Sequence, residues 1–100
     1  MDQIEAINKV QQYKLLLMNY FDLDKVYLYG SYAKNTNKTD SDIDVAIIVN
    51  QLTGDYFSTT PILWKLRRQI DDRIEPILLE KGNDKSGFID EIQRYGIEII

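Results

Sequence analysis

Hydrophobic and polar residues along this chain follow a period that changes from helical to extended and back. Between Asp2 and about Tyr20, apolar residues recur every three or four positions, which predicts an amphipathic helix with Asp2 as N-cap and Glu5 completing a capping box. Two short runs rich in β-branched and aromatic residues, 25–29 and 43–49, predict strands. The second run is so apolar that helices should cover both faces of its sheet.

The same alternation continues in the second half of the chain. Pro61 fits the first position of a helix that Thr60 caps and that runs to about Asp71. Residues 73–79 then predict a strand, in which Pro76 indicates an edge position or a strand end. The other expected segments are loops at 31–41, 51–60 and 81–87, a short helix at 88–95 and a final short strand at 97–100.

This interleaving of helices and strands predicts an α/β or α+β fold with one small mixed β-sheet flanked by helices. With 100 residues, 44% of them hydrophobic, the chain should form a single domain over residues 1–100. The net charge of −4 and the lack of a basic stripe argue against nucleic-acid binding. No apolar run approaches the ~20 residues of a membrane span, and the acidic N-terminus does not resemble a secretory signal. We therefore expect a cytoplasmic protein that does not contact membranes.

The absence of two residue types narrows the possible chemistry. The chain contains no cysteine, which excludes disulfides, thiolate zinc sites and cysteine nucleophiles. It also contains no histidine, which excludes a Ser-His-Asp triad and any imidazole base or metal ligand. Catalysis would have to use carboxylates, hydroxyls, amines, backbone amides or bound hard metal ions.

Two aspartates at the start of the apolar strand are candidates for such chemistry. Residues two apart in a strand project on the same face, so Asp42 and Asp44 should place two carboxylates side by side. Like charges at that distance are tolerated when a cation lies between them, and Mg²⁺ prefers oxygen ligands. By itself the pair more often belongs to a solvated loop before the strand, with Asp40 as a third member, because short motifs match by chance.

A glycine and a serine follow the first predicted strand. Gly30 would let the backbone approach a ligand closely, and a helical turn starting at Ser31 would offer free amides and a hydroxyl to a phosphate. An ordinary strand-ending turn is the simpler interpretation of these two residues alone. Both classical phosphate-loop motifs are absent.

The combined pattern is more specific. Gly30-Ser31, then ten residues, then Asp42-x-Asp44 in a hydrophobic strand resembles the signature of the DNA polymerase β nucleotidyltransferase superfamily. The chain looks like the minimal nucleotidyltransferase branch, whose order of elements it follows over nearly its whole length. The resemblance implies the nucleotidyltransferase fold, and metal ligation by Asp42, Asp44 and a third carboxylate on the strand after the second helix. Glu75 stands there, although it could also be an exposed side chain or an ion-pair partner of Arg73.

One departure from the family affects the turn. Family members often carry Arg-Gly where this chain has Lys34 and Asn35. Lys34 could still meet a phosphate as a point charge, or be a solvated loop lysine. Asn35 tolerates a left-handed backbone better than most residues, so we expect the turn to form.

Several aromatic and basic residues admit two interpretations each. The tyrosines of the first strand and the turn could stack on a nucleobase, although tyrosines of a sheet usually pack inside it. Trp64 is expected in the core or at a partner interface. The basic segment 65–68 is expected on a solvated helix face or in a patch that meets an acidic partner. The three tyrosines are Tyr27, Tyr29 and Tyr32.

The resemblance also implies an activity and a partner. It implies two Mg²⁺ ions, ATP as substrate, and transfer of AMP to a hydroxyl, with Gly30, Ser31 and Lys34 binding the nucleotide. A chain of this length leaves no room for an acceptor-binding domain, so we expect a HEPN-domain toxin to present the acceptor, a tyrosine, and this chain to act as its antitoxin. Two alternatives stay open: a small-molecule acceptor, and an antitoxin that neutralises its partner by binding alone.

Overall fold

The computed structural model describes residues 1–100 except Thr53 and Lys85, two residues of the predicted loops 51–60 and 81–87 that lie outside the described part. Helices and strands interleave as predicted, in a mixed α/β structure. None of the described helices has the length and apolar character needed to cross a membrane. In chain order the elements are α1 (Gln3–Leu17), β1 (Leu23–Tyr29), β2 (Ile43–Val49), α2 (Tyr56–Arg67), β3 (Ile74–Glu80), α3 (Phe88–Tyr95) and β4 (Ile97–Glu98).

The strands form one four-stranded mixed sheet in the order β3-β2-β1-β4. Strands β2 and β3 run parallel, as expected for two strands joined by a crossover helix, whereas β1 is antiparallel to both of its neighbours. Pro76 lies on β3, at the edge of the sheet, which confirms the position predicted for a residue that cannot donate to a ladder.

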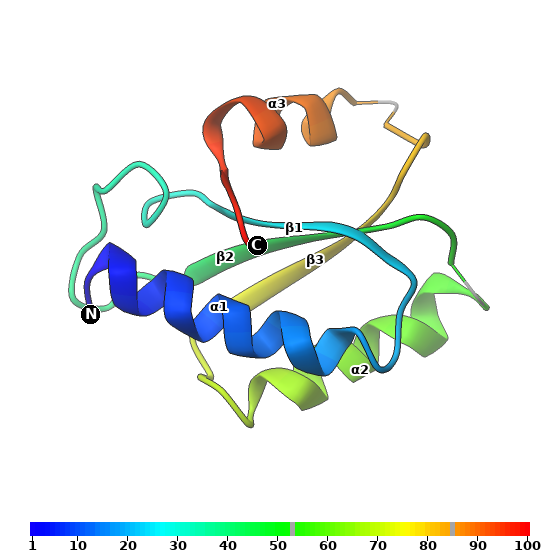
Figure 1. Cartoon of the computed structure of the whole chain (residues 1–100), viewed down its shortest axis with the longest axis horizontal. Helices are drawn as coiled ribbons and strands as arrows, with labels where there is room; N and C mark the ends of the chain where they lie inside the picture. Colours follow the sequence, from blue (N-terminus) through cyan, green and yellow to red (C-terminus); the bar gives the residue numbers. More distant parts are fainter. Residues whose placement is uncertain (53, 85) are drawn as a thin grey trace.

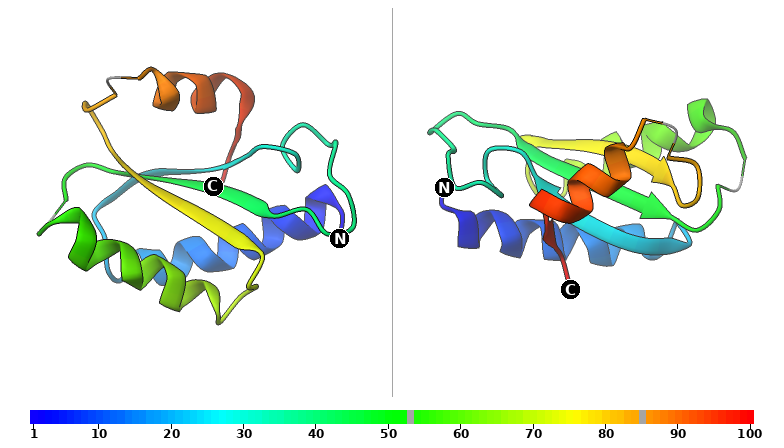
Figure 2. Two further views of the ribbon diagram at one scale, coloured as in Figure 1. Left: turned by 180° about the vertical axis from the view of Figure 1, so that it is seen from behind. Right: turned by 90° about the horizontal axis from the view of Figure 1, so that it is seen from above.

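The sheet separates two layers of unequal size. Helices α1 and α2 lie side by side along one face, and α3 covers part of the other face (Figures 1 and 2). The larger core lies under α1 and α2 and includes Val10, Tyr13, Ile47 and Leu63. The smaller core lies under α3 and consists of Tyr27, Ala46, Ile48, Ile89 and Ile92. The half-covered face therefore leaves one end of the sheet open to ligands.

The first helix has the predicted N-cap. The Asp2 carboxylate accepts a hydrogen bond from the backbone N–H of Glu5 at 2.8 Å, which satisfies one of the free amides of the first turn. The helix ends at Leu17, a few residues before the predicted end near Tyr20, because the chain turns there before β1.

The prediction for the second helix was wrong about its start. The helix begins at Tyr56 rather than Pro61, and its N-cap is Asp55, whose side chain accepts from the Ser58 N–H at 2.8 Å. The hydroxyl of Thr59 also donates to the Asp55 carbonyl, at 2.9 Å. Polar side chains of the first turn thus form hydrogen bonds with its own backbone groups. Pro61 lies inside the helix, where it removes one hydrogen bond of the second turn.

The final strand is shorter than predicted. Only Ile97 and Glu98 pair with β1, opposite Leu28 and Tyr27. Ile99 still donates its N–H to the Val26 carbonyl at 2.8 Å and is buried in the larger core.

Candidate functional site

The candidate site begins at the turn that ends β1. Gly30 adopts a positive φ of 73° and Asn35 one of 58°. Asn35 therefore has the left-handed backbone conformation that the sequence allowed for it. The N–H of Lys34 bonds to the Gly30 carbonyl at 3.1 Å, which closes one helical turn. In the described part of the chain no carbonyl accepts from the amides of residues 31–33, because these are the first amides of that turn. The turn therefore presents free N–H groups, as a phosphate site requires.

The N-terminus of α1 supports this turn from the core side. The Gln3 amide donates to the carbonyls of Tyr32 and Ala33, at 2.9 and 3.3 Å. Tyr32 is fully buried in the larger core and cannot stack on a nucleobase. A residue of α1 and a residue of the core thus fix the turn in place.

Gly30 and Asp44 touch across the β1–β2 pair. A Cβ at position 30 would lie 2.1 Å from Oδ2 of Asp44, so only glycine leaves room for this carboxylate. Tyr29 is the register partner of Asp44 in the ladder. The phosphate-type turn and the predicted metal ligand are therefore in direct contact.

Glu75 completes a row of polar side chains across three strands. It is the register partner of Asp44 on the parallel strand β3, so both side chains project from the face that α3 only partly covers. The alternative in which Glu75 pairs with Arg73 is wrong: the Arg73 guanidinium binds Asp71 at 2.8 Å. The structure thus brings Glu75 next to Asp44 with its charge uncompensated by Arg73.

The electrostatics of the row reflect crowded negative charge. Burial raises the pKa of the Asp44 carboxyl, and the nearby charges of Asp42 and Glu75 raise it further. Burial also raises the pKa of the Tyr29 hydroxyl, with Asp44 and Glu75 adding to the effect. The side chains that share this face therefore destabilise one another's negative charge, and a cation would relieve that cost.

The carboxylates suit a metal that shares its ligands with a substrate. Among the described residues no group of three or more histidine, cysteine, aspartate or glutamate side chains could hold a metal ion by itself. Mg²⁺ rarely needs such a cage, because it usually binds one or two carboxylates together with substrate phosphates. Asp42 and Asp44, beside a turn with free amides, are that kind of donor set.

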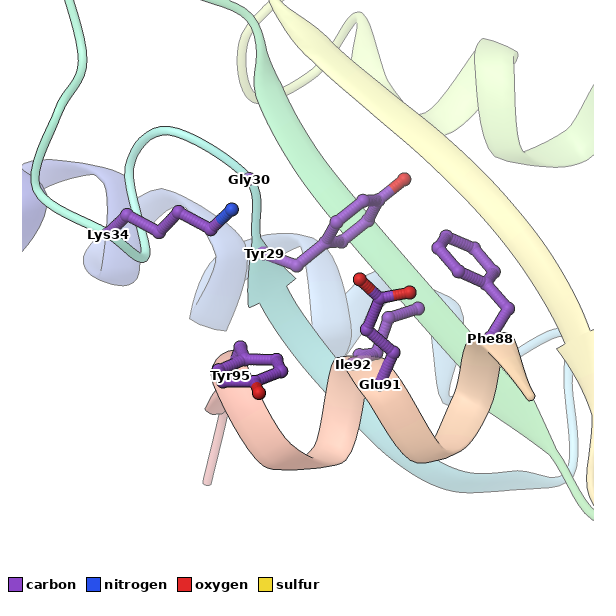
Figure 3. A pocket seen from close by; sticks show the side chains of 8 residues that line it. Tyr29, Gly30, Lys34, Phe88, Glu91, Ile92 and Tyr95 are labelled. Atoms are coloured by element: carbon purple, nitrogen blue, oxygen red, sulfur yellow. The ribbon is translucent and has the colours of Figure 1, made fainter.

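An open pocket lies between this turn and α3 (Figure 3). Gly30 and Lys34 line one side of it, with the Lys34 amine extending toward Gly30. Phe88, Glu91 and Tyr95 of α3 line the other side. The pocket thus combines two predicted nucleotide-binding residues with residues of α3 that belong to no sequence motif.

The exposure of the remaining aromatic and basic side chains decides between the two interpretations of each. Tyr27 is 5% exposed in the smaller core, so Tyr29 is the one of the three tyrosines that lines the pocket. Trp64 is 38% exposed and lies outside the core, with the Arg67 guanidinium 4.5 Å from its ring centre. Arg67 also donates to the backbone carbonyl of Ile74 at 3.0 Å, so it is not simply part of a solvated face.

Comparison with known proteins identifies relatives of the same fold. Residues 11–100 match the family described as Polymerase beta, Nucleotidyltransferase. The "Putative protein adenylyltransferase MJ0141" of Methanocaldococcus jannaschii is 35% identical over 79 residues, which cover 77% of this chain and 79% of that protein. Protein adenylyltransferase MntA of Shewanella oneidensis is 29% identical over 80 residues, which cover 80% of this chain and 57% of MntA.

Solved structures give the same picture. A "putative nucleotidyltransferase" from Sulfolobus solfataricus superimposes with a TM-score of 0.72 at 19% identity, covering 96% of this chain and 80% of that one. A toxin–antitoxin solved with AMP-PNP superimposes with a TM-score of 0.68 at 26% identity, covering 93% of this chain and 73% of that one. These likenesses confirm the nucleotidyltransferase fold predicted from the sequence.

Proposed function

Because the chain belongs to the polymerase beta nucleotidyltransferase family, we propose that it transfers AMP from ATP to a hydroxyl group of a partner protein. The observation that carries this proposal is the contact between the turn at Gly30 and the carboxylate of Asp44. That contact would place a bound triphosphate directly beside the carboxylates. The names of two relatives, "Putative protein adenylyltransferase MJ0141" and "Protein adenylyltransferase MntA", support AMP as the group transferred.

Residues of the turn would bind the donor. The free amides of residues 31–33 and the hydroxyl of Ser31 would donate hydrogen bonds to the oxygens of the terminal phosphates. The amine of Lys34 would add a point charge beside them. The Gly30 backbone would allow the phosphates to approach without steric conflict.

In the reaction, the acceptor oxygen attacks the α-phosphorus of ATP, and the bond to the bridging oxygen of the β-phosphate breaks. Pyrophosphate leaves, and the acceptor's proton goes to a carboxylate. Glu75 is our choice for this base, because it lies across Asp44 from the turn that would hold the leaving pyrophosphate. Asp44 is the alternative base.

Two Mg²⁺ ions would be held by Asp42 and Asp44 together with the substrate phosphates, with Glu75 completing one site. When bound, such ions lower the pKa of the attacking hydroxyl and neutralise charge on the triphosphate. The chain's own contribution is to fix the carboxylates in register, without an ion pair to them from any lysine or arginine that the structure describes.

The proposed acceptor is a tyrosine of a HEPN-domain toxin, with this chain as antitoxin. Support comes from solved relatives that are toxin–antitoxin complexes. The half-covered face of the sheet beside Asp44 would give a protein acceptor access to the carboxylates.

The test is to incubate the chain with its toxin partner, Mg²⁺ and radiolabelled ATP, beside the double variant Asp42→Asn and Asp44→Asn. Changing the outer partners of metal ligands alone costs roughly 10–100-fold, so losing two ligands should reduce labelling of the partner by more than about a hundredfold. Circular dichroism should show an unchanged fold.

Asp40→Asn is the matched control, because Asp40 is an exposed aspartate of the same segment that precedes β2. It should label the partner at the wild-type rate. Undiminished labelling by the double variant would contradict the mechanism. A partner silenced by the double variant without any label would instead favour an antitoxin that acts by binding alone.

A further inference from the structure

The pocket between the turn and α3 displays two opposite charges that do not neutralise each other. Lys34 and Glu91 both line it, and neither forms an ion pair with any residue that the structure describes. Glu91 is exposed, and its carboxylate points from α3 toward Tyr29 (Figure 3). The pocket is therefore positive on the side of the phosphate-type turn and negative on the side of α3.

Aromatic rings form much of the remaining wall. Tyr29 and Phe88 meet edge to face, with ring centres 5.8 Å apart, which fixes both rings at the pocket. Tyr95 is 66% exposed and stands at the rim, on the side of Lys34. Large exposed aromatic rings beside a cavity are suited to stacking against a planar ligand.

The last turn of α3 is held close to the sheet. A Cβ at Gly96 would lie 2.6 Å from the Ile92 carbonyl and 3.1 Å from the Leu28 carbonyl. The Gly96 N–H also bonds to the Ile92 carbonyl at 2.7 Å. This tight helix end fixes the distance between the α3 wall and the turn at Gly30.

We propose that this pocket receives the base of the donor nucleotide and that Glu91 recognises the exocyclic amino group of adenine. This inference rests on the proposed function, which places the triphosphate at the turn. Gly30 belongs both to the pocket and to the contact with Asp44, so a nucleotide whose phosphates lie at the turn can extend its nucleoside toward α3. A carboxylate only accepts hydrogen bonds, and the amino group of adenine donates them.

The geometry favours the donor's base over the acceptor side chain. In an in-line displacement the acceptor and the leaving pyrophosphate lie on opposite sides of the reacting phosphorus. The pocket lies on the Gly30 side of Asp44, whereas Glu75 lies on the other side, one strand further across the sheet. The acceptor would therefore enter over β3 and leave the pocket to the nucleoside.

The experiment measures, by calorimetry, the binding of two ligands to the wild-type chain and to Glu91→Ala, with Mg²⁺ and without an acceptor. Its ligands are ATP and purine riboside triphosphate, which lacks only the amino group. Wild-type protein should bind ATP about tenfold more tightly, because a hydrogen bond to a charged group is lost in the analogue. Glu91→Ala should bind both ligands alike, at the weaker affinity.

Three further measurements locate the effect. Tyr95→Ala should weaken both nucleotides about tenfold through lost stacking. Asp90→Ala removes an acidic side chain from the same helix outside the pocket and should change neither affinity. Inorganic tripolyphosphate, which has no nucleoside, should bind wild-type and Glu91→Ala protein equally.

Two results would overturn the inference while leaving the proposed function intact. One is normal ATP binding and transfer by Glu91→Ala with the preference for the amino group retained. The other comes from titrating dATP in the same way. If wild type prefers ATP over dATP and Glu91→Ala abolishes that preference, Glu91 contacts the ribose and not the base. Wild-type protein that binds neither ATP nor tripolyphosphate would overturn the proposed function as well.

Discussion

At the scale of single residues, the turn and the carboxylates meet at Asp44. This side chain contacts Gly30 and is the register partner of Glu75 on β3.

Asp44 should lower the free energy of unfolding of the ligand-free protein at neutral pH. Its carboxyl pKa is raised by burial and by Asp42 and Glu75, so unfolding favours its ionised form. Stability therefore falls as pH rises above the ordinary aspartate value near 3.8 and through the raised pKa. Asp44→Asn should raise the free energy of unfolding at pH 7 without metal, and this gain should shrink toward zero as pH falls below about 4.

Urea unfolding at several pH values, in the presence of a chelator, measures this effect. Asp40→Asn, which neutralises an exposed aspartate, should leave the free energy of unfolding within about 0.5 kcal/mol of wild type. A loss of stability in Asp44→Asn at pH 7 would contradict the crowded charge inferred for this face.

Residue spacing predicts only part of this site. Asp42, Asp44 and the Gly30 turn could be predicted because their separation along the chain is itself the motif. Glu75 needed the resemblance to the family, and the register of β2 and β3 then placed it beside Asp44. Glu91 could not be predicted, because a single glutamate on a short exposed helix has no local pattern, and it reaches the pocket through the packing of α3 against β1.

At the scale of elements, hydrophobic periodicity predicts the three helices and four strands that the described residues form, while local capping decides where they begin and end. The polar composition of Asp55, Ser58 and Thr59 predicts a loop, but α2 begins there because these side chains satisfy the backbone groups of its first turn. Proline is common at the first position of a helix, which is why Pro61 predicts a start there, but α2 begins five residues earlier and contains this proline. Of the two positions predicted for Trp64, the structure excludes the core, because an apolar side chain on a helix need not face it; the partner interface stays a prediction.

The ion pairs that Asp71 forms with Lys9 and Arg73 should hold α1 and the start of β3 together. The Asp71 side chain, 10% exposed, accepts from Lys9 of α1 and from Arg73 just before β3. Hydrogen bonds from Arg73 and Lys9 hold the pKa of Asp71 well below its usual range. Because the Ile43 N–H bonds to the Arg73 carbonyl at 2.8 Å, this cluster also anchors the start of β2.

Asp71→Asn should therefore lower the free energy of unfolding by about 1–2 kcal/mol at pH 7. A lowered carboxyl pKa contributes stability above the unfolded value near 3.8, and that contribution is lost as pH falls below it. The difference between variant and wild type should thus narrow below about pH 4. Chemical unfolding from pH 3 to pH 7 measures it, with the exposed neighbour variant Asp72→Asn as control. A difference that does not change with pH would refute the assigned role of the carboxylate.

At the scale of the whole molecule, the two faces of the sheet have different tasks. The face under α1 and α2 holds the larger core and fixes the strands. The face under α3 stays partly open at the ends of β1, β2 and β3, where the turn, the carboxylates and the pocket meet. A small fold can carry this chemistry because one face provides stability and the other remains accessible.

Transfer of a nucleotidyl group by this chain is tested most directly by comparing two labels on ATP. Parallel reactions with the toxin partner and Mg²⁺ would contain ATP labelled at the α-phosphorus or at the γ-phosphorus. We predict that the α-label becomes covalently attached to the partner and that the γ-label appears only in released pyrophosphate. Attachment of the γ-label to the partner would show phosphoryl transfer and would contradict the account.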